Sequence, residues 1–166
     1  MRSIPFARAG VLVGLLAFVS VAVADEVKIE LKDVPKAVLD AVKAKFPKAE
    51  LTGATKETEE GKTTYEIALK DKGQKVDVAL TADGKITEIE TEIAARDLPE
   101  AVSSALEAKY PKATIKKAEL ITEIDGAKES KNYEVVVVTE AKKSLEVKVS
   151  PEGKILKEDG GGEDKD

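Results

Sequence analysis

The chain of 166 residues contains one sequence pattern twice. Residues 33–52 read DVPKAVLDAVKAKFPKAELT, residues 97–116 read DLPEAVSSALEAKYPKATIK, and ten of the twenty aligned positions are identical. Shorter landmarks recur downstream in the same order: Tyr65-Glu66 and Tyr133-Glu134, then ADGKI (82–86) and PEGKI (151–155). A nearly fixed period of roughly 65 residues is typical of duplicated structural units. We therefore predict two tandem units, residues 25–92 and 93–157.

Each unit is predicted to begin with a helix that buries one face. Apolar residues recur at the spacing i, i+3, i+4, i+7, i+8 and i+12, which is the helical period. They are Val34, Ala37, Val38, Ala41, Val42 and Phe46 in the first unit, and Leu98, Ala101, Val102, Ala105, Leu106 and Tyr110 in the second. Pro35 and Pro99 suit the first helical position, whereas Pro47 and Pro111 end each helix.

Alternation of apolar and polar residues predicts strands after each helix. The first unit shows it at 64–70 and 75–81, and the second at 133–138 and 145–149. Shorter alternating stretches precede the helices, and Gly-containing turns separate the strands. We predict an α+β fold made of two tandem repeats, each with one helix packed on an antiparallel β-sheet.

The two ends of the chain are predicted to lie outside this fold. Residues 1–24 combine Arg2 and Arg8 with an apolar run that closes on Ala-Val-Ala, the pattern of a signal peptide cleaved after Ala24. The 16 apolar residues of that run fall short of the roughly 20 that a spanning helix needs. We therefore expect a periplasmic or secreted protein that is not inserted in a membrane after cleavage. Residues 158–166, EDGGGEDKD, are predicted to be an acidic, disordered tail.

Composition narrows the classes of function. Removing the two arginines of the signal leaves 27 − 2 = 25 basic residues against 32 acidic ones, a net charge of −7, which disfavours a nucleic-acid partner. The sequence contains neither histidine nor cysteine, so the usual zinc ligands and the Ser-His and Cys-His catalytic arrangements are absent. We expect no catalytic residue, no cofactor and no dedicated metal site, and therefore not an enzyme.

The landmarks together resemble a known family. The pattern VP-x2-V-x7-FPKA, TYEIAL and VDVALTADGKI, repeated as LP-x2-V-x7-YPKA, NYEVVV and LEVKVSPEGKI, is similar to tandem PepSY-like domains, also described as beta-lactamase-inhibitor-protein-like modules of exported bacterial proteins. The resemblance covers roughly residues 26 to 157. It implies a helix packed on an antiparallel sheet and a role in binding or inhibition, and it carries no catalytic motif.

Two strand faces are candidate binding sites. Val136 and Val138 occupy the outward positions of YEVVVVTE, where they form either a partner-binding strip or a surface covered by another part of the chain. Glu88, Glu90 and Glu92 share one strand face, which is either a cation site or an ordinary solvated surface.

We expect an exported, non-catalytic binding module whose partner is an exported or envelope protein or peptide, with an inhibitor-like role as one form of that binding. The alternatives are a module that senses calcium or another small ligand through its acidic strand faces, and a structural envelope protein.

Overall fold

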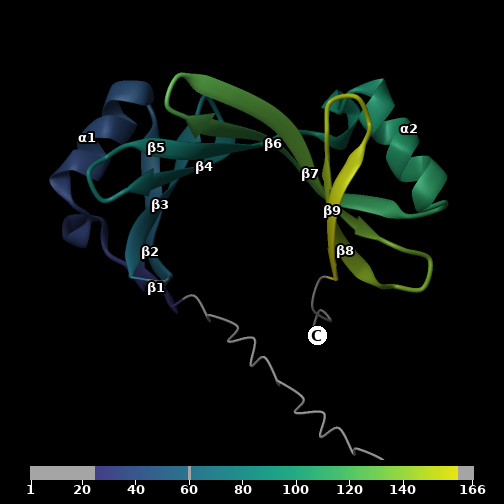
Figure 1. Ribbon diagram of the computed structural model, residues 1–166, viewed down its shortest axis with the longest axis horizontal. Helices are drawn as coiled ribbons and strands as arrows, with labels where there is room; N and C mark the ends of the chain where they lie inside the picture. The colour runs from purple at the N-terminus through teal and green to yellow at the C-terminus, as the bar shows by residue number, and fades with distance from the viewer. Residues whose placement is uncertain (1–24, 60, 161–166) are drawn as a thin grey trace, which may run out of the picture.

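The chain forms one antiparallel sheet and two helices in the computed structural model, which describes residues 25–59 and 61–160 (Figure 1). The nine strands lie side by side in the order in which they occur in the sequence. They are β1 (Asp25–Ile29), β2 (Glu50–Glu59), β3 (Lys62–Asp71), β4 (Gln74–Thr81), β5 (Ile86–Glu92), β6 (Thr114–Asp125), β7 (Lys128–Val138), β8 (Ser144–Val149) and β9 (Ile155–Gly160). Helix α1 (Lys36–Lys45) lies between β1 and β2 in the sequence, and α2 (Glu100–Lys109) lies between β5 and β6.

Both helices end where the prolines predict, and each begins one residue after its predicted first residue, Pro35 or Pro99. Pro35 and Pro99 are the N-cap residues, and each helix is preceded by a short 3-10 turn, Leu31–Asp33 or Ala95–Asp97. At the other end the backbone N–H of the aromatic residue, Phe46 or Tyr110, donates a hydrogen bond of 2.8 Å into the last helical turn. The next residue is a proline, which has no N–H to continue the ladder, so the helix ends there.

Each helix buries its apolar stripe against a different half of the sheet. The first cluster packs α1 against β2–β5 through Val34, Val38, Val42, Ala54, Ile67, Leu69, Val76, Val78, Leu80 and Ile89. The second packs α2 against β6–β8 through Leu98, Val102, Leu106, Ala118, Val135, Val137, Val147 and Val149. Along β3, β4, β7 and β8 the residues that pack against a helix alternate with residues of the opposite side. Both helices lie on the same face of the sheet, because the register of β5 and β6 places Ile89 of the first cluster and Ala118 of the second on one side. On β6, Glu119 and Ile121 are buried on the other side.

The predicted fold class, two repeats that each have their own antiparallel sheet, is wrong. β5 pairs with β6 from Glu88↔Glu123 to Glu92↔Glu119, so one continuous sheet crosses the boundary between the predicted units. A separate first unit would leave the N–H and C=O groups of one edge of β5 unpaired, and pairing with β6 satisfies them. Over residues 25–59 and 61–160 the structure is therefore a single nine-stranded sheet that carries two α-helices.

A glycine in each half allows a hairpin turn to approach a helix closely. Gly84, in the turn between β4 and β5, has φ +87°, and Gly153, between β8 and β9, has φ +84°. A Cβ at Gly84 would lie 2.6 Å from the carbonyl oxygen of Ala37 in α1, and one at Gly153 would lie 2.4 Å from that of Ala101 in α2. Only glycine fits these two positions, because both the backbone conformation and the space forbid a side chain.

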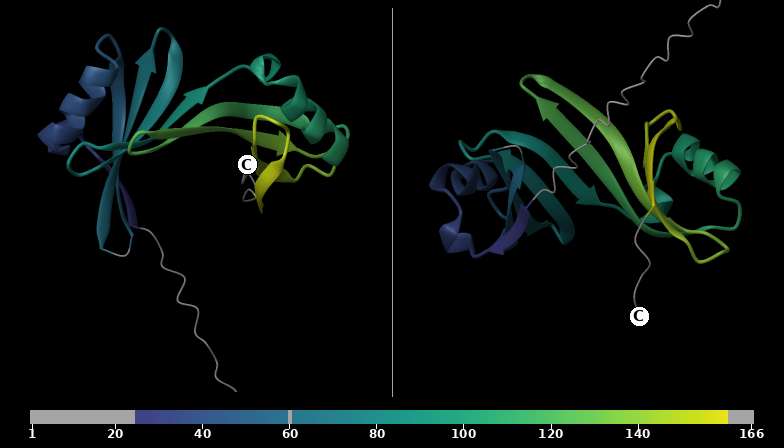
Figure 2. Two further views of the ribbon diagram at one scale, coloured as in Figure 1. Left: turned by 45° about the horizontal axis from the view of Figure 1, so that its top comes forward. Right: turned by 60° about the horizontal axis from the view of Figure 1, so that its bottom comes forward.

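The sheet bends strongly, and its two halves form an arch with the helices on the outside (Figures 1 and 2). β1 and β9 are the two edges of the sheet. Val27 and Leu156, the large apolar side chains that are exposed among the described residues, lie on these edge strands. Neither α1 nor α2 lies over the inner side of the arch (Figure 2).

Two predictions concern the ends of the chain. The predicted signal peptide, residues 1–24, lies outside the described residues. Strand β9 continues to Gly160 and so takes in the first three residues of the predicted tail, while 161–166 lie outside the described residues. Within the described ranges, neither helix has the length and apolar character needed to cross a membrane.

Candidate functional site

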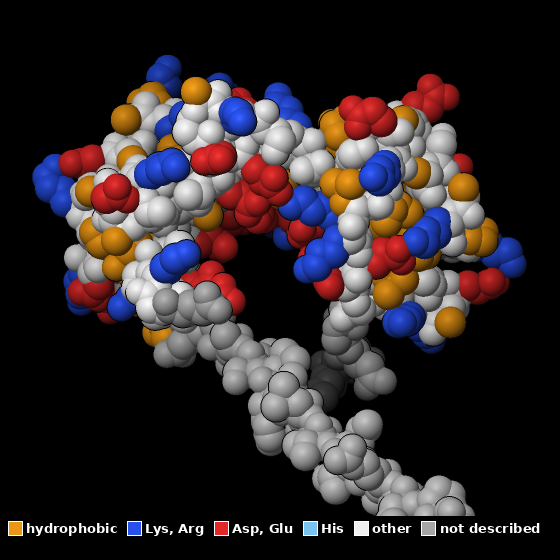
Figure 3. Space-filling model, in the orientation of Figure 1, with side chains coloured by type: hydrophobic (Ala, Val, Ile, Leu, Met, Phe, Trp, Pro, Cys, Tyr) orange, Lys and Arg blue, Asp and Glu red, His pale blue; other side chains and the backbone are white. Residues whose placement is uncertain are grey.

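The side of the sheet that faces away from both helices is the candidate site, and we call it the open face. Its residues are those that alternate with the buried core residues along each strand. Seven carboxylates of β3–β6 belong to it: Glu66, Asp77, Glu88, Glu90, Glu92, Glu119 and Glu123. Acidic side chains accordingly line the hollow beneath the arch in the space-filling view (Figure 3).

Lysines neutralise only part of this acidic surface. Glu92 pairs with Lys75 at 3.1 Å, Glu119 with Lys117 at 2.7 Å, and Glu123 with Lys148 at 2.5 Å. The other four carboxylates make no ion pair within the described ranges: Glu66, Asp77, Glu88 and Glu90. The centre of the open face therefore keeps an excess of negative charge.

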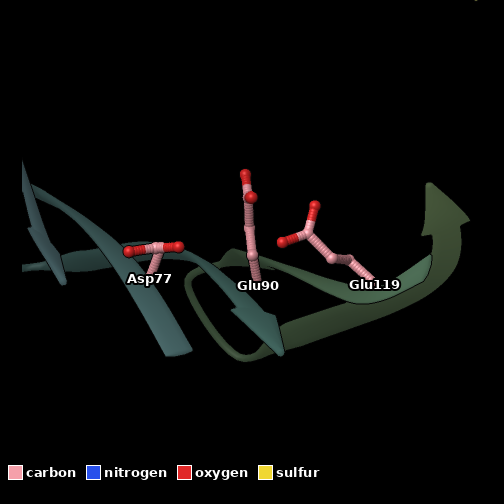
Figure 4. Close-up of side chains that lie close together, drawn as sticks. All are labelled: Asp77, Glu90 and Glu119. Carbon is pink, nitrogen blue, oxygen red and sulfur yellow. The ribbon is translucent and has the colours of Figure 1, made fainter. Parts of the chain in front are cut away.

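Three of the carboxylates converge at the middle of the sheet, and we call Asp77, Glu90 and Glu119 the carboxylate cluster. One oxygen of each lies within 4.8 Å of the others. They come from the adjacent strands β4, β5 and β6, where register places Asp77 opposite Glu90, and they stand on the same side of the sheet (Figure 4). Glu119 is buried, with its side chain 5% exposed, and the other two are partly buried.

Burial and mutual repulsion change the protonation of this surface. Burial, followed by the charges of Glu119, Glu88 and Glu134 and a hydrogen bond with Glu88, raises the pKa of Glu90 from 4.5 to about 8. Burial also raises the pKa of Asp77 above its usual value, although the Lys117 ammonium partly opposes this. These carboxyl groups therefore hold protons more tightly than free side chains do, and a bound cation would favour their ionised form.

Glu66 and Glu134 extend the same behaviour to both sides of the cluster. Burial raises the pKa of Glu66, and the charge of Asp77 adds to the effect. Burial and then the charge of Glu146 raise the pKa of Glu134, while Lys148 and Lys117 lower it. The perturbed carboxyl groups thus reach from β3 to β7, which makes the acidity a property of the whole central face.

Val136 and Val138, the predicted partner-binding strip, lie on the open face of β7. Both are partly buried. Val136 lies opposite Lys117 on β6 and Glu146 on β8, and Val138 lies opposite Ser144. Neither α1 nor α2 covers this part of the sheet, so the valines form a small apolar area on the α2 half of the open face, beside the acidic area.

Sequence reasoning identified one strand of the acidic area and missed its partners. Glu88, Glu90 and Glu92 do share a strand face, as predicted. Asp77 and Glu119 could not be placed beside Glu90, because their proximity depends on the register of β4 and β6 against β5. The sequence signal is that each is a single acid between two apolar residues of a strand, in VDVAL and KAELI.

A cleft of about 600 Å³ lies outside the open face, beside the end of α2. Leu106, Tyr110, Ile115 and Val137 form much of its wall, and Glu107 and Lys112 are its charged residues. Leu106 and Val137 belong to the second core cluster, and Tyr110 and Ile115 pack against it. The apolar wall of the cleft is therefore part of the core packing. The cleft lacks a group of convergent polar side chains, so the open face is the better candidate.

Comparison with known proteins identifies a family and a fold. The family described as beta-lactamase-inhibitor-like, PepSY-like matches the chain twice, over residues 22–88 and 76–157. No curated protein matches the sequence.

Three solved structures share the fold with the chain. A DUF2874 family protein from Bacteroides uniformis is 18% identical and has a TM-score of 0.64, covering 76% of this chain and 88% of its own. A candidate periplasmic protein from Bacteroides eggerthii is 16% identical with a TM-score of 0.65 and the same coverage. A BLIP-like protein from Bacteroides fragilis is 22% identical, has a TM-score of 0.61, and covers 80% of this chain and 92% of its own. At these identities the likeness establishes the fold.

Proposed function

Since this chain belongs to the PepSY-like family, described as beta-lactamase-inhibitor-like, we propose that it is an exported, non-catalytic module that binds another protein or peptide in the periplasm. The signal-peptide pattern at 1–24 and the similarity to a candidate periplasmic protein support export. The similarity to a BLIP-like protein supports binding as the activity. The sequence lacks the histidine and cysteine that most nucleophilic active sites use, which agrees with a non-catalytic role.

The open face is the surface that we assign to binding. The observation that carries this assignment is the set of four carboxylates that make no ion pair with any described residue, at the centre of a sheet face that neither α1 nor α2 covers. Partly desolvated carboxyl groups with raised pKa values are typical of functional surfaces, because their cost to stability needs a compensating role. Val136 and Val138 supply apolar contact area beside them.

A protein or peptide suits this surface better than an enclosed small molecule does. The face runs across several strands of a curved sheet and is open to solvent along the arch (Figure 3). Small-molecule sites are usually concave pockets that bury most of the ligand. An extended or convex part of a partner can instead lie within the hollow and contact the acidic and apolar areas at once.

Site-specific crosslinking tests the assignment. The sequence contains no cysteine, so an introduced cysteine is labelled at one known position. A photocrosslinker is attached to Val136→Cys on the open face and, as a control, to Glu107→Cys on the outer surface of α2. Each labelled protein is irradiated in the exported fraction of cells that produce it. We expect one defined adduct from Val136→Cys that is absent from Glu107→Cys. Equal adducts from both positions, or adducts from Glu107→Cys alone, would contradict binding through the open face.

Calcium sensing is the alternative that the same carboxylates could serve. Calcium takes six to eight oxygen ligands, and three carboxylates supply at most six. The Lys117 ammonium, at 2.7 Å from Glu119, would have to leave before a divalent ion could use that residue. Calorimetry and thermal unfolding with calcium separate the two proposals: protein binding predicts neither heat nor a higher melting temperature, whereas sensing predicts both.

A further inference from the structure

We infer that the partner presents a cationic polypeptide segment, and that a lysine or arginine side chain of this segment enters the open face between Asp77 and Glu90. The inference rests on the proposed function, because it names the chemistry of the partner that the open face would bind. Its grounds are the distribution of charge on the face, the ammonium group already present beside the cluster, and the shape of the surface.

Charge complementarity is the first ground. Glu66, Asp77, Glu88 and Glu90 lie on the adjacent strands β3, β4 and β5, and none has an ion-pair partner in the described part of the chain. Like charges this close repel, and partial burial weakens the screening by water. A cationic segment relieves this repulsion, whereas an acidic or neutral segment leaves it in place, so the surface selects for positive charge.

Lys117 shows which kind of cation the cluster accepts. Its ammonium lies 2.7 Å from the buried Glu119 carboxylate. Burial alone would lower the pKa of Lys117, but the hydrogen bond and charge of Glu119, together with the charges of Glu90 and Asp77, raise it. The cluster thus already stabilises one ammonium group, on the β6 side. Asp77 and Glu90, on the β4 and β5 side, remain for a second cationic side chain from the partner.

The occupant is a polypeptide segment because the cationic and apolar contacts are spread out. The unpaired carboxylates lie on β3–β5, while Val136 and Val138 lie on β7, on the other side of the cluster. A single metal ion could contact the carboxylate cluster but could not also contact Val136 and Val138. A segment with spaced basic residues and an apolar residue can contact both areas along the hollow.

Binding of this kind should release protons. The charged groups that face Glu90 are Glu88 on its own strand, Asp77 on β4, Glu119 and Lys117 on β6, and Glu134 on β7. Burial, followed by the charges of the acids among them, keeps the Glu90 carboxyl protonated near neutral pH. A cation between Asp77 and Glu90 favours the ionised form, so the affinity for the cationic segment should rise with pH up to about 8, the pKa of Glu90.

Calorimetry with an eight-residue lysine peptide, capped at both ends, tests the inference on the full chain. The test variant is Asp77→Asn/Glu90→Gln, and the matched control is Asp33→Asn/Glu107→Gln, which removes one aspartate and one glutamate carboxyl group from exposed positions outside the open face. We expect one peptide bound per chain, affinity lowered about tenfold or more in the test variant, and affinity within about twofold of wild type in the control. Affinity of the wild type should also increase with pH, and this increase should be lost in the test variant.

The possible outcomes separate the inference from the proposed function. Equal weakening in both variants would mean non-specific attraction to an acidic protein and would overturn the inference. Absence of peptide binding, with the Val136→Cys adduct still formed, would overturn the cationic partner and leave binding through the open face intact. Absence of both would overturn both. Melting curves of the variants ensure that any loss of binding is read from folded protein.

Discussion

The raised pKa of Glu90 predicts that one contribution to the free energy of unfolding decreases as pH rises, the opposite of ordinary acid denaturation. The pKa of Glu90 is about 8 in the folded chain against 4.5 for a free side chain. Between these values the folded state binds more protons than the unfolded state, so this group makes the free energy of unfolding fall as pH rises. Its stabilising contribution is complete below about pH 4.5 and is lost as pH rises through about 8.

The informative change is Glu90→Gln, which keeps the size of the side chain and removes its charge. A pKa difference of 8 − 4.5 = 3.5 would correspond to about 5 kcal/mol at about 1.36 kcal/mol per pKa unit. Glu90 is only partly buried, so water screens the repulsion, and we expect the variant to be more stable than wild type by ~1–2 kcal/mol at pH 9. At pH 5 the two proteins should be nearly equal.

Urea unfolding at several pH values between 5 and 9 measures this difference. Glu107→Gln, on the exposed side of α2, is the control and should follow the wild-type pH profile. Parallel profiles for Glu90→Gln and wild type would refute the reasoning. So would a variant that is less stable than wild type at pH 9, because the carboxylate would then be stabilising rather than repelled.

Three further predictions concern the fold. In the same urea assay Gly153→Ala should destabilise the protein by about 2–4 kcal/mol, because the added Cβ would meet the Ala101 carbonyl and the backbone has a positive φ. Gly73→Ala should destabilise it by only about 1 kcal/mol, because φ is also positive there but no atom lies within 4 Å of the added Cβ. Val78→Ala and Val147→Ala should each lower the free energy of unfolding by roughly 2 kcal/mol. The double variant should lower it by the sum of the two within about 0.5 kcal/mol, because the residues belong to different core clusters. A large coupling energy would contradict two separate clusters. Absorbance titration should show one tyrosine that ionises at about pH 12, because burial and the hydrogen bond of 2.5 Å to Glu158 raise the pKa of Tyr110. Tyr110→Phe should remove this ionisation, and Glu158→Gln should move it toward pH 10.

The sequence predicts the local structure of this protein well because local chemistry determines it. Pro35 and Pro47 bracket α1, and Pro99 and Pro111 bracket α2, independently of the rest of the chain. Alternation along β3 and β7 identifies which side of each strand faces the helix, so it places Val136 and Val138 on the opposite side; it does not decide whether another part of the chain covers them.

The arrangement of strands is a different kind of information. Whether β5 ends one sheet or joins β6 depends on pairing between segments about 30 residues apart. The apolar and polar periodicity of a strand shows which side is buried but does not identify the strand that pairs with it. The carboxylate cluster depends on the same pairing, since Glu119 reaches Glu90 only because β5 and β6 are adjacent. The error in fold class and the failure to predict the cluster therefore have one cause.

The most direct test of binding through the open face is to map the contact surface by NMR. The backbone amide signals of the isotopically labelled full chain are followed while the capped eight-residue lysine peptide is added. Binding through the open face predicts that the signals that shift most belong to open-face residues of β3–β7, with Asp77, Glu90 and Glu119 among them. Shifts confined to α1, α2 or the edge strands, with β4–β6 unchanged, would contradict it.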